Sequence, residues 1–197
     1  MIKVFILHNK QEAPQRTKNA LKLLSMFDGA EIFEAIYPNT ITEYDKELLD
    51  TINSKKKTYN GYNYGYVSNL KIFQRCIEEN YQRVLILEDD AELLPYITMD
   101  MYYEIITKMK NIPIIYLGGN FYNKSPNKII MTDAVLFNNI EVIKDFYNHI
   151  LNLEKIPDGG IDLLLDIYCR ERKNRLQIKI FKSPHCGGTT IMDKHKK

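Results

Sequence analysis

Two kinds of apolar segment alternate along the chain. Short runs rich in Ile, Leu and Val are typical of buried strands, whereas longer segments with an apolar residue every three or four positions are typical of amphipathic helices. The pattern predicts strands at 2–7, 32–36, 84–88, 112–117, 134–137 and 176–180, and helices at 14–26, 41–53, 67–77, 98–110, 142–150 and 161–168. This alternation is typical of an α/β fold in which helices cover an open, mostly parallel sheet.

The strand predicted at 84–88 ends in a cluster of carboxylates. Four apolar residues lead directly into Glu88, Asp89 and Asp90, and Glu92 follows two positions later. A buried strand tolerates such a cluster at its carboxyl end, where α/β sheets open into a crevice, provided that something positive offsets the repulsion. A hard divalent cation that carries phosphate oxygens would do so. Alternatively, these acidic residues have no ligand and are ordinary loop and helix-capping residues that follow a strand.

Composition narrows the class of protein. The chain is 45% hydrophobic and 26% charged, which is typical of a globular protein with one large core. We therefore expect one domain over residues 1–191, followed by a mobile basic tail at 192–197. A net charge of +2 argues against a surface built to bind nucleic acid.

Neither the cysteines nor the N-terminal segment point to an extracellular protein. The three cysteines are far apart in the sequence, so neither a disulfide framework nor a structural zinc site is predicted. The apolar start of the chain is too short for a secretory signal or a transmembrane segment. These features predict a cytoplasmic protein with no transmembrane segment.

Three classes of protein place carboxylates after a strand to hold a metal. A nucleotide triphosphatase would also need a GxxxxGK[ST] loop to wrap the phosphates, and the sequence has none. A phosphoacceptor signalling domain would carry its acidic pair after the first strand, but here the acids follow the third. The remaining class is a glycosyltransferase, in which carboxylates hold a divalent ion against the diphosphate of a sugar nucleotide.

Further segments accompany the Leu87–Ala91 sequence LEDDA in a fixed order. They are an opening strand with a polar loop and an arginine (Phe5–Asn9 and Arg16), Gly65–Asn69, Ile115–Gly118, Thr132–Leu136 and Gly160–Leu164. Together they resemble glycosyltransferase family 25, the lipopolysaccharide and collagen type of galactosyltransferase, over nearly the whole chain. The chain departs from the family at Asn69, where the family has histidine, and in a Tyr-rich stretch that precedes it. The resemblance implies a GT-A-like (Rossmann-like) single domain.

The resemblance also implies a metal site. Glu88 and Asp90 stand at the positions of the Asp-x-Asp (DXD) motif, with Asp90 as the direct ligand of Mn²⁺ or Mg²⁺ and Asp89 facing the ribose or donor sugar. Asp90 with Glu92 is an alternative ligand pair. His185, after the last predicted strand, is a candidate third ligand, although a lone histidine is more often an ordinary surface or core residue.

Residues for the nucleotide sugar are expected near the carboxyl ends of the first strands. His8, Asn9 and Arg16 follow the first strand, and an arginine fork suits phosphate oxygens. Tyr37 follows the second strand and can stack on the base, although it can equally cap the core. Asn69 is assigned to the same ligand by its place in the family motif.

Asp162 is the candidate catalytic base. The resemblance suggests an inverting enzyme, which needs a carboxylate to take the proton of the acceptor hydroxyl. Asp162 begins a predicted helix after a Gly-Gly loop, a placement that also fits an N-cap aspartate. Asp158 and Asp133 are the reserve candidates. The tyrosines of the stretch before the third helix offer rings for a loop that closes over the donor: Tyr59, Tyr62, Tyr64 and Tyr66.

The sequence thus predicts a metal-dependent glycosyltransferase. It would move a hexosyl or deoxyhexosyl group from a nucleoside diphosphate sugar, with UDP-sugars favoured, to a hydroxyl of a glycan or glycoconjugate acceptor. The rival interpretation is a catalytically inert, metal-dependent nucleotide- or glycan-binding domain of the same fold. Release of nucleoside diphosphate that depends on the donor would separate the two.

Overall fold

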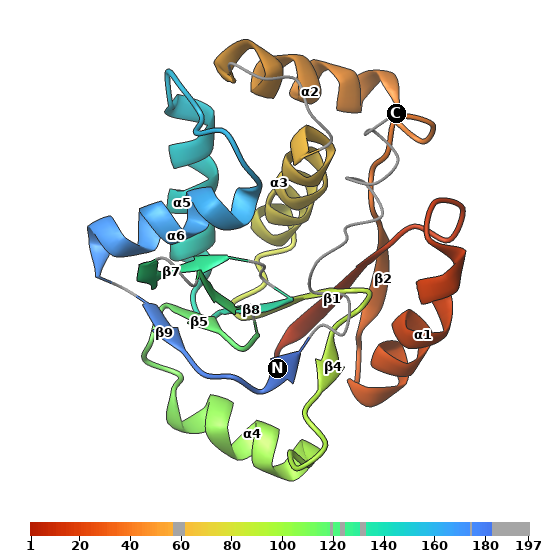
Figure 1. Cartoon of the computed structure of the whole chain (residues 1–197), viewed down its shortest axis with the longest axis vertical. Helices are drawn as coiled ribbons and strands as arrows, with labels where there is room; N and C mark the ends of the chain where they lie inside the picture. Colours follow the sequence, from red (N-terminus) through yellow and green to blue (C-terminus); the bar gives the residue numbers. More distant parts are fainter. Residues whose placement is uncertain (57–61, 119, 123–124, 131–132, 174, 183–197) are drawn as a thin grey trace.

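A six-stranded sheet forms the centre of the molecule (Figure 1). The computed structural model describes residues 1–56, 62–118, 120–122, 125–130, 133–173 and 175–182. In spatial order the strands are β2 (Glu31–Glu34), β1 (Lys3–His8), β3 (Val84–Glu88), β8 (Ala134–Phe137), β5 (Ile114–Tyr116) and β9 (Arg175–Gln177). β1 is parallel to β2 and β3, and β5 is parallel to β9. β8 runs antiparallel to both of its neighbours, β3 and β5.

Helices cover both faces of this sheet. On one face lie α3 (Tyr62–Glu78), α5 (Ile140–Asn152) and α6 (Ile161–Arg172), and α2 (Glu43–Lys55) packs on α3 (Figure 1). On the other face lie α1 (Thr17–Met26), which follows the short 3-10 helix η1 (Pro14–Arg16), and α4 (Met99–Lys108). Two small ribbons complete the fold: β4 (Glu92–Leu93) with β10 (Phe181–Lys182), and β6 (Asn120–Tyr122) with β7 (Ser125–Ile130).

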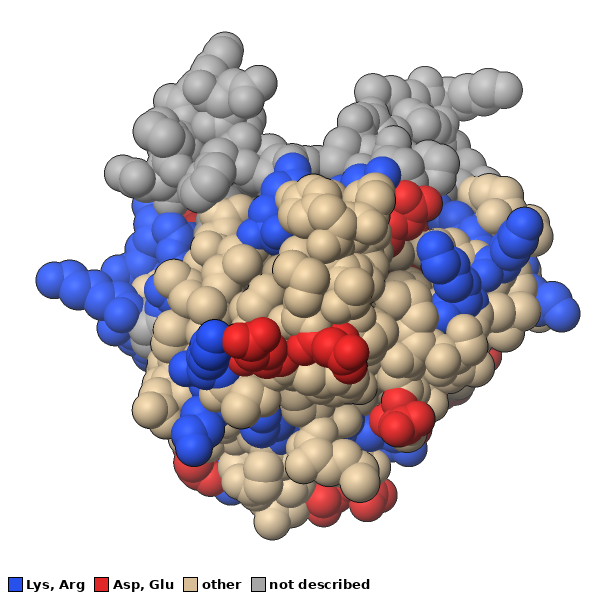
Figure 2. Space-filling view, turned by 90° about the horizontal axis from the view of Figure 1, so that it is seen from below, with Lys and Arg blue, Asp and Glu red and all other residues tan. Residues whose placement is uncertain are grey.

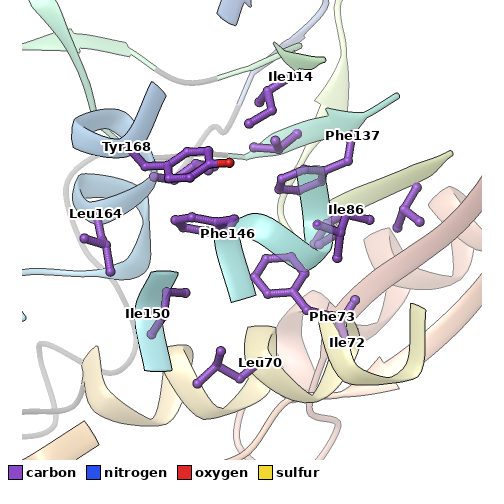
Figure 3. Packing of buried hydrophobic residues seen from close by; sticks show 14 of the residues in the cluster. Leu70, Ile72, Phe73, Ile86, Ile114, Phe137, Phe146, Ile150, Leu164 and Tyr168 are labelled. Carbon is purple, nitrogen blue, oxygen red and sulfur yellow. The ribbon is translucent and has the colours of Figure 1, made fainter. Parts of the chain in front are cut away.

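The alternation of side chains along β3 divides the core in two. Val84 and Ile86 pack towards α3, α5 and α6, whereas Leu85 and Leu87 pack towards α1 and α4, because successive residues of a strand face opposite sides. In the first of these layers the ring of Phe146 lies between those of Phe73 and Tyr168, with centroid distances of 5.7 and 4.8 Å (Figure 3). The same alternation places Glu88 on the α3, α5 and α6 side.

Local capping explains where several helices begin. Thr42 and Asp45 form a capping box at α2, in which each side chain bonds the other residue's backbone N–H. The side chains of Thr98 and Asn139 cap α4 and α5 in the ordinary N-cap geometry. These signals fix the helices at about the positions that periodicity predicts.

The predicted mixed α/β fold with a mostly parallel sheet is confirmed, but two local predictions are wrong. The alternation at 176–180 does not form a single strand, because β9 ends at Gln177 and the chain next pairs as β10, antiparallel to β4. The Tyr-rich stretch is not a loop from residue 62 onwards, because α3 begins at Tyr62 and Tyr64 and Tyr66 are buried. Those tyrosines therefore do not belong to a loop that closes over a ligand. Tyr59 and the tail at 192–197 lie outside the described residues.

The surface carries both signs of charge. On the face in Figure 2, acidic and basic side chains of the described residues are interspersed, and the basic ones do not form one broad patch. This agrees with the small net charge of +2. No helix in the described part of the chain combines the length and apolar character that a membrane crossing requires.

Candidate active site

The acidic sequence after β3 forms a tight turn that α1 holds in place. The backbone N–H of Ala91 donates to the carbonyl of Glu88 over 3.0 Å, which closes the turn. The side-chain amide of Asn19 on α1 donates to the carbonyls of Asp89 and Ala91, each over 2.9 Å. One side chain therefore satisfies two backbone acceptors of the turn and fixes it against the helix.

Asp89 points back into the protein. Its carboxylate pairs with His8 Nδ1 at 2.8 Å and accepts from Arg16 Nη1 at 2.9 Å, while His8 Nε2 lies 3.0 Å from the Thr17 hydroxyl. His8 and Asp89 are both buried. A buried carboxylate with two such partners is held in one orientation.

Arg16 links two carboxylates of the turn. Its Nη1 lies 2.9 Å from Asp89 and 3.4 Å from Asp90, whose side chain is also buried. Burial alone would lower the pKa of the guanidinium, but the charges of Asp90 and Asp89 outweigh it and raise the pKa. Arg16 therefore stays charged, and its guanidinium lies against buried carboxylates and not in open solvent.

Asn9 and Tyr37 complete this side of the site in different ways. The side-chain oxygen of Asn9 accepts from the backbone N–H groups of Gln11 and Glu12, and its amide donates to the carbonyl of Ala35 over 2.9 Å. Asn9 thus joins the loops after β1 and β2. The half-buried Tyr37 has its pKa raised to about 12, by burial first and then by the charge of Asp89, so its phenol is neutral.

Glu88 faces the opposite side of the sheet from Asp89 and stands in a strongly negative environment. The residue as a whole keeps surface in contact with solvent, but the protein packed around its carboxyl group desolvates that group and raises its pKa well above the usual value. Repulsion from Asp90, Asp133 and Asp162 adds to the rise. Removal from bulk water and negative neighbours act in the same direction, because both disfavour the ionised carboxyl group.

The antiparallel strand β8 brings Asp133 beside Glu88. The carbonyl of Asp133 accepts from the backbone N–H of Glu88 over 2.9 Å, and its side chain is buried. A Cβ atom on Gly118, at the end of β5, would lie 3.2 Å from the Asp133 Cβ atom. Glycine therefore leaves room for the Asp133 side chain between the ends of two strands.

Asp162 lies in the first turn of α6, whose N-cap is Gly160 without a side-chain hydrogen bond. The N-cap alternative for Asp162 is therefore wrong. Tyr66 donates its hydroxyl to the carbonyl of Gly160 over 3.1 Å, and Lys56 Nζ donates to the carbonyl of Gly159 over 2.8 Å. A Cβ atom on Gly160 would come within 2.4 Å of Asp162 Oδ1, so glycine at this position lets the carboxylate fold back over the turn, and a larger residue would displace it.

The carboxylates supply hard oxygen donors for a divalent cation, but not a complete set. Within the described ranges, no three His, Cys, Asp or Glu side chains are grouped so that they could hold a metal alone. The excess of negative charge around Glu88 is what a cation would relieve. The donors therefore fit part of a shell that phosphate oxygens of a ligand would complete. His185 lies outside the described residues.

The predicted site residues form two groups at one edge of the sheet. His8, Arg16, Asp89 and Asp90 are joined by direct contacts on the α1 side. Asn69, Glu88 and Asp162 line one cavity on the α3 and α6 side. The two groups meet at the turn.

Sequence reasoning missed the residues that support these groups. These supporting residues are Asn19, Thr17 and Tyr66. They have no assigned contact with the ligand, but they hold in place the residues that are assigned to it. Asn19 lies three positions after Arg16, one helical turn along the same face, and this spacing is the signal that could have identified it. Tyr66 carries no such signal, because its partner Gly160 is far away in the sequence.

Comparison with solved structures identifies the fold. The chain is similar to a glycosyltransferase involved in the glycosylation of the major capsid of PBCV-1, with 13% identity, 98% of each chain covered and a TM-score of 0.55. It is also similar to the apo form of mouse xyloside xylosyltransferase 1, with 10% identity, coverage of 90% of this chain and 72% of that chain, and a TM-score of 0.50. At such low identity these likenesses show a GT-A-like fold and no more.

Sequence comparison identifies the family. A search of curated proteins gave no significant match. The model of glycosyltransferase family 25 (LPS biosynthesis protein) matches residues 1–184, which include every described residue of the candidate site. The chain therefore belongs to glycosyltransferase family 25.

Proposed function

We propose that this protein transfers a sugar from a nucleoside diphosphate donor, with UDP-sugars favoured, to a hydroxyl of a glycan acceptor. The observation that carries the proposal is the convergence of Glu88, Asp90 and Asp162 at one edge of a GT-A-like sheet. Membership of the family supports sugar transfer as the reaction. Metal dependence, the identity of the donor and inversion at the anomeric carbon are parts of the proposal.

Asp90 and Glu88 would hold the divalent ion, Mn²⁺ or Mg²⁺, which supplies positive charge for the departing diphosphate. Arg16 lies against Asp90 and is fully charged, so it suits phosphate oxygens on the same side of the turn. Asp89 orients this group, because its pairing with His8 and Arg16 fixes both the turn and the guanidinium. The chain's own contribution is thus to concentrate and orient charge where the leaving group would be.

Asp162 would accept the proton of the acceptor hydroxyl as that oxygen attacks the anomeric carbon. Its half-buried carboxylate lies close enough to Glu88 to raise the pKa of that group. Tyr66 and Lys56 hold the turn before it, so the carboxylate is presented from a fixed position. A base that is held in place in this way avoids the cost of ordering it during the reaction.

The first prediction concerns Asp90 as the metal ligand. With Mn²⁺ and the preferred nucleotide sugar at about 100 times its dissociation constant, the wild type should gain about 2.7 kcal/mol in the free energy of unfolding. Asp90→Asn should lose the part of this gain that depends on Mn²⁺. The gain is measured by thermal unfolding with UDP-, GDP-, CMP- and dTDP-linked sugars, each with and without Mn²⁺. Glu92→Gln is the matched control and should respond as the wild type does. An unchanged metal response in Asp90→Asn, with a loss in Glu92→Gln, would favour Glu92 as the ligand.

The second prediction concerns Asp162 as the base. Asp162→Asn should lower the rate of transfer by about 10²- to 10⁴-fold, because the amide cannot accept the proton. The affinity for donor and metal should remain that of the wild type, as measured by calorimetry beside a transfer assay. Asp158→Asn provides a control on the same turn, and a loss confined to that variant would transfer the role to Asp158.

The third prediction concerns Tyr66 as a positioning residue. Tyr66→Phe removes the hydroxyl that holds the Gly160 carbonyl and keeps the buried ring. Loss of one such hydrogen bond, worth about 1 kcal/mol, should lower kcat about fivefold while KM for the donor stays constant. Tyr102→Phe changes an equally buried tyrosine on the opposite face of the sheet and should leave kcat unaltered. Equal effects of the two variants would show a general loss of stability instead.

A further inference from the structure

A cavity lies next to Glu88, between the sheet and the helices α3, α5 and α6. Its volume, taken as the space open to the centre of a water molecule, is ≈ 40 Å³. Three polar residues line it: Glu88, which is exposed, and Asn69 and Asp162, which are half-buried, as are the apolar lining residues Leu7 and Ile161. These residues therefore form the rim of the cavity, on the side of the candidate site.

The deeper part of the cavity, its floor, is lined by apolar residues of the core. The rings of Phe73 and Phe146 contribute to it, and both are buried (Figure 3). Leu165 on α6 and Val135 on β8 are lining residues as well. Protein interiors leave few voids larger than one water molecule, and this hollow, which opens beside Glu88, exceeds that size.

The size and lining of the cavity restrict what can occupy it. One water molecule needs about 10–15 Å³ by this measure, so the cavity admits a group of roughly three or four heavy atoms and no sugar ring. Water would find few hydrogen-bond partners beyond the rim, and a buried water requires two to four. A methyl-bearing substituent fits both the volume and the apolar floor.

The rim indicates which molecule carries that substituent. Glu88 on the rim and the nearby Asp90 are the residues assigned to the metal that faces the diphosphate, so a sugar attached to that diphosphate would lie over the rim. Building on the proposed function, we propose that the donor sugar bears a methyl group, from an N-acetyl or a 6-deoxy substituent, that is seated in this cavity. Asn69 on the rim then faces the hydroxyls of the ring.

Paired donors test this inference and separate the two sources of the methyl group. Dissociation constants are measured by calorimetry with Mn²⁺ for UDP-N-acetylglucosamine against UDP-glucose, and for GDP-6-deoxymannose against GDP-mannose. One methyl-bearing donor should bind at least about tenfold more tightly than its parent. The apolar floor accepts a methyl group but offers no hydrogen-bond partner to the hydroxyl of the parent sugar, and one methylene group in an apolar pocket is worth about 10- to 200-fold. The pair that shows the difference identifies the substituent.

Variants at Val135 test whether the cavity is responsible. Val135→Ile adds a methylene group to the cavity and should erase the preference while the parent hexose donor binds as before. Val135→Ala enlarges the cavity and should shift the preference towards a longer substituent, such as an N-propionyl group. Val4→Ile is the matched control, because it adds the same methylene group to the core on the opposite face of the sheet. Unfolding temperatures of all three variants exclude a loss of fold as the cause.

Several outcomes would overturn the inference. One is equal affinity for the parent and methyl-bearing donors in both pairs, and another is an intact preference in Val135→Ile. Either result would leave the proposed function standing, provided that UDP or GDP with Mn²⁺ still binds. If no nucleotide or nucleotide sugar binds, the proposed function fails and the inference fails with it.

Discussion

The pairing of Asp89 with His8 and Arg16 is the constraint on which the rest of the site depends. A buried carboxylate without partners is costly, and here one partner comes from the end of β1 and the other from the start of α1. Together with Asn19, they lock the turn after β3 against α1. If the turn shifted, these buried groups would lose their hydrogen-bond partners, which costs free energy. The positions of Glu88 and Asp90 follow from this arrangement.

Strand alternation and sheet topology then concentrate negative charge. Glu88 points to one side of the sheet and Asp89 to the other, and the antiparallel β8 adds Asp133 beside Glu88. Asp162 lies on α6, and the hydroxyl of Tyr66 on α3 holds the turn that precedes it. Three elements thus bring carboxylates together, and their charges add to the desolvation that raises the pKa of Glu88. Sites that bind a cation and a diphosphate require this kind of preorganised charge.

The sequence predicts the fold well because most of its elements carry local signals. Strand β3 and its acidic end, the capped helices and the helix that carries Asp162 all have periodicity or capping residues of their own. The start of α3 was missed because tyrosines in a polar context resemble a loop, although Tyr66 and Leu70 lie on the same helical face as Phe73. The antiparallel direction of β8 has no local signature, because it is set by pairing with distant strands.

The sequence names residues that the structure brings to one edge of the sheet, but it does not indicate the partners that hold them. Arg16 was assigned to the phosphates and Asp90 to the metal, and the structure brings their side chains within 3.4 Å of each other. Asp89 and Asn9 were expected to face a ligand, but their side chains have several protein partners that no sequence spacing indicates. The apolar cavity beside Glu88 comes from side chains of six elements, so it can be seen only in the folded chain.

A crystal structure with Mn²⁺ and the nucleotide sugar that gives the largest thermal stabilisation would test the account most directly. The account predicts Mn²⁺ on the Asp90 carboxylate and the diphosphate, Arg16 against the phosphates, and the sugar between Glu88 and Asp162. A nucleotide bound at another edge of the sheet, or a metal that does not contact the turn after β3, would contradict it.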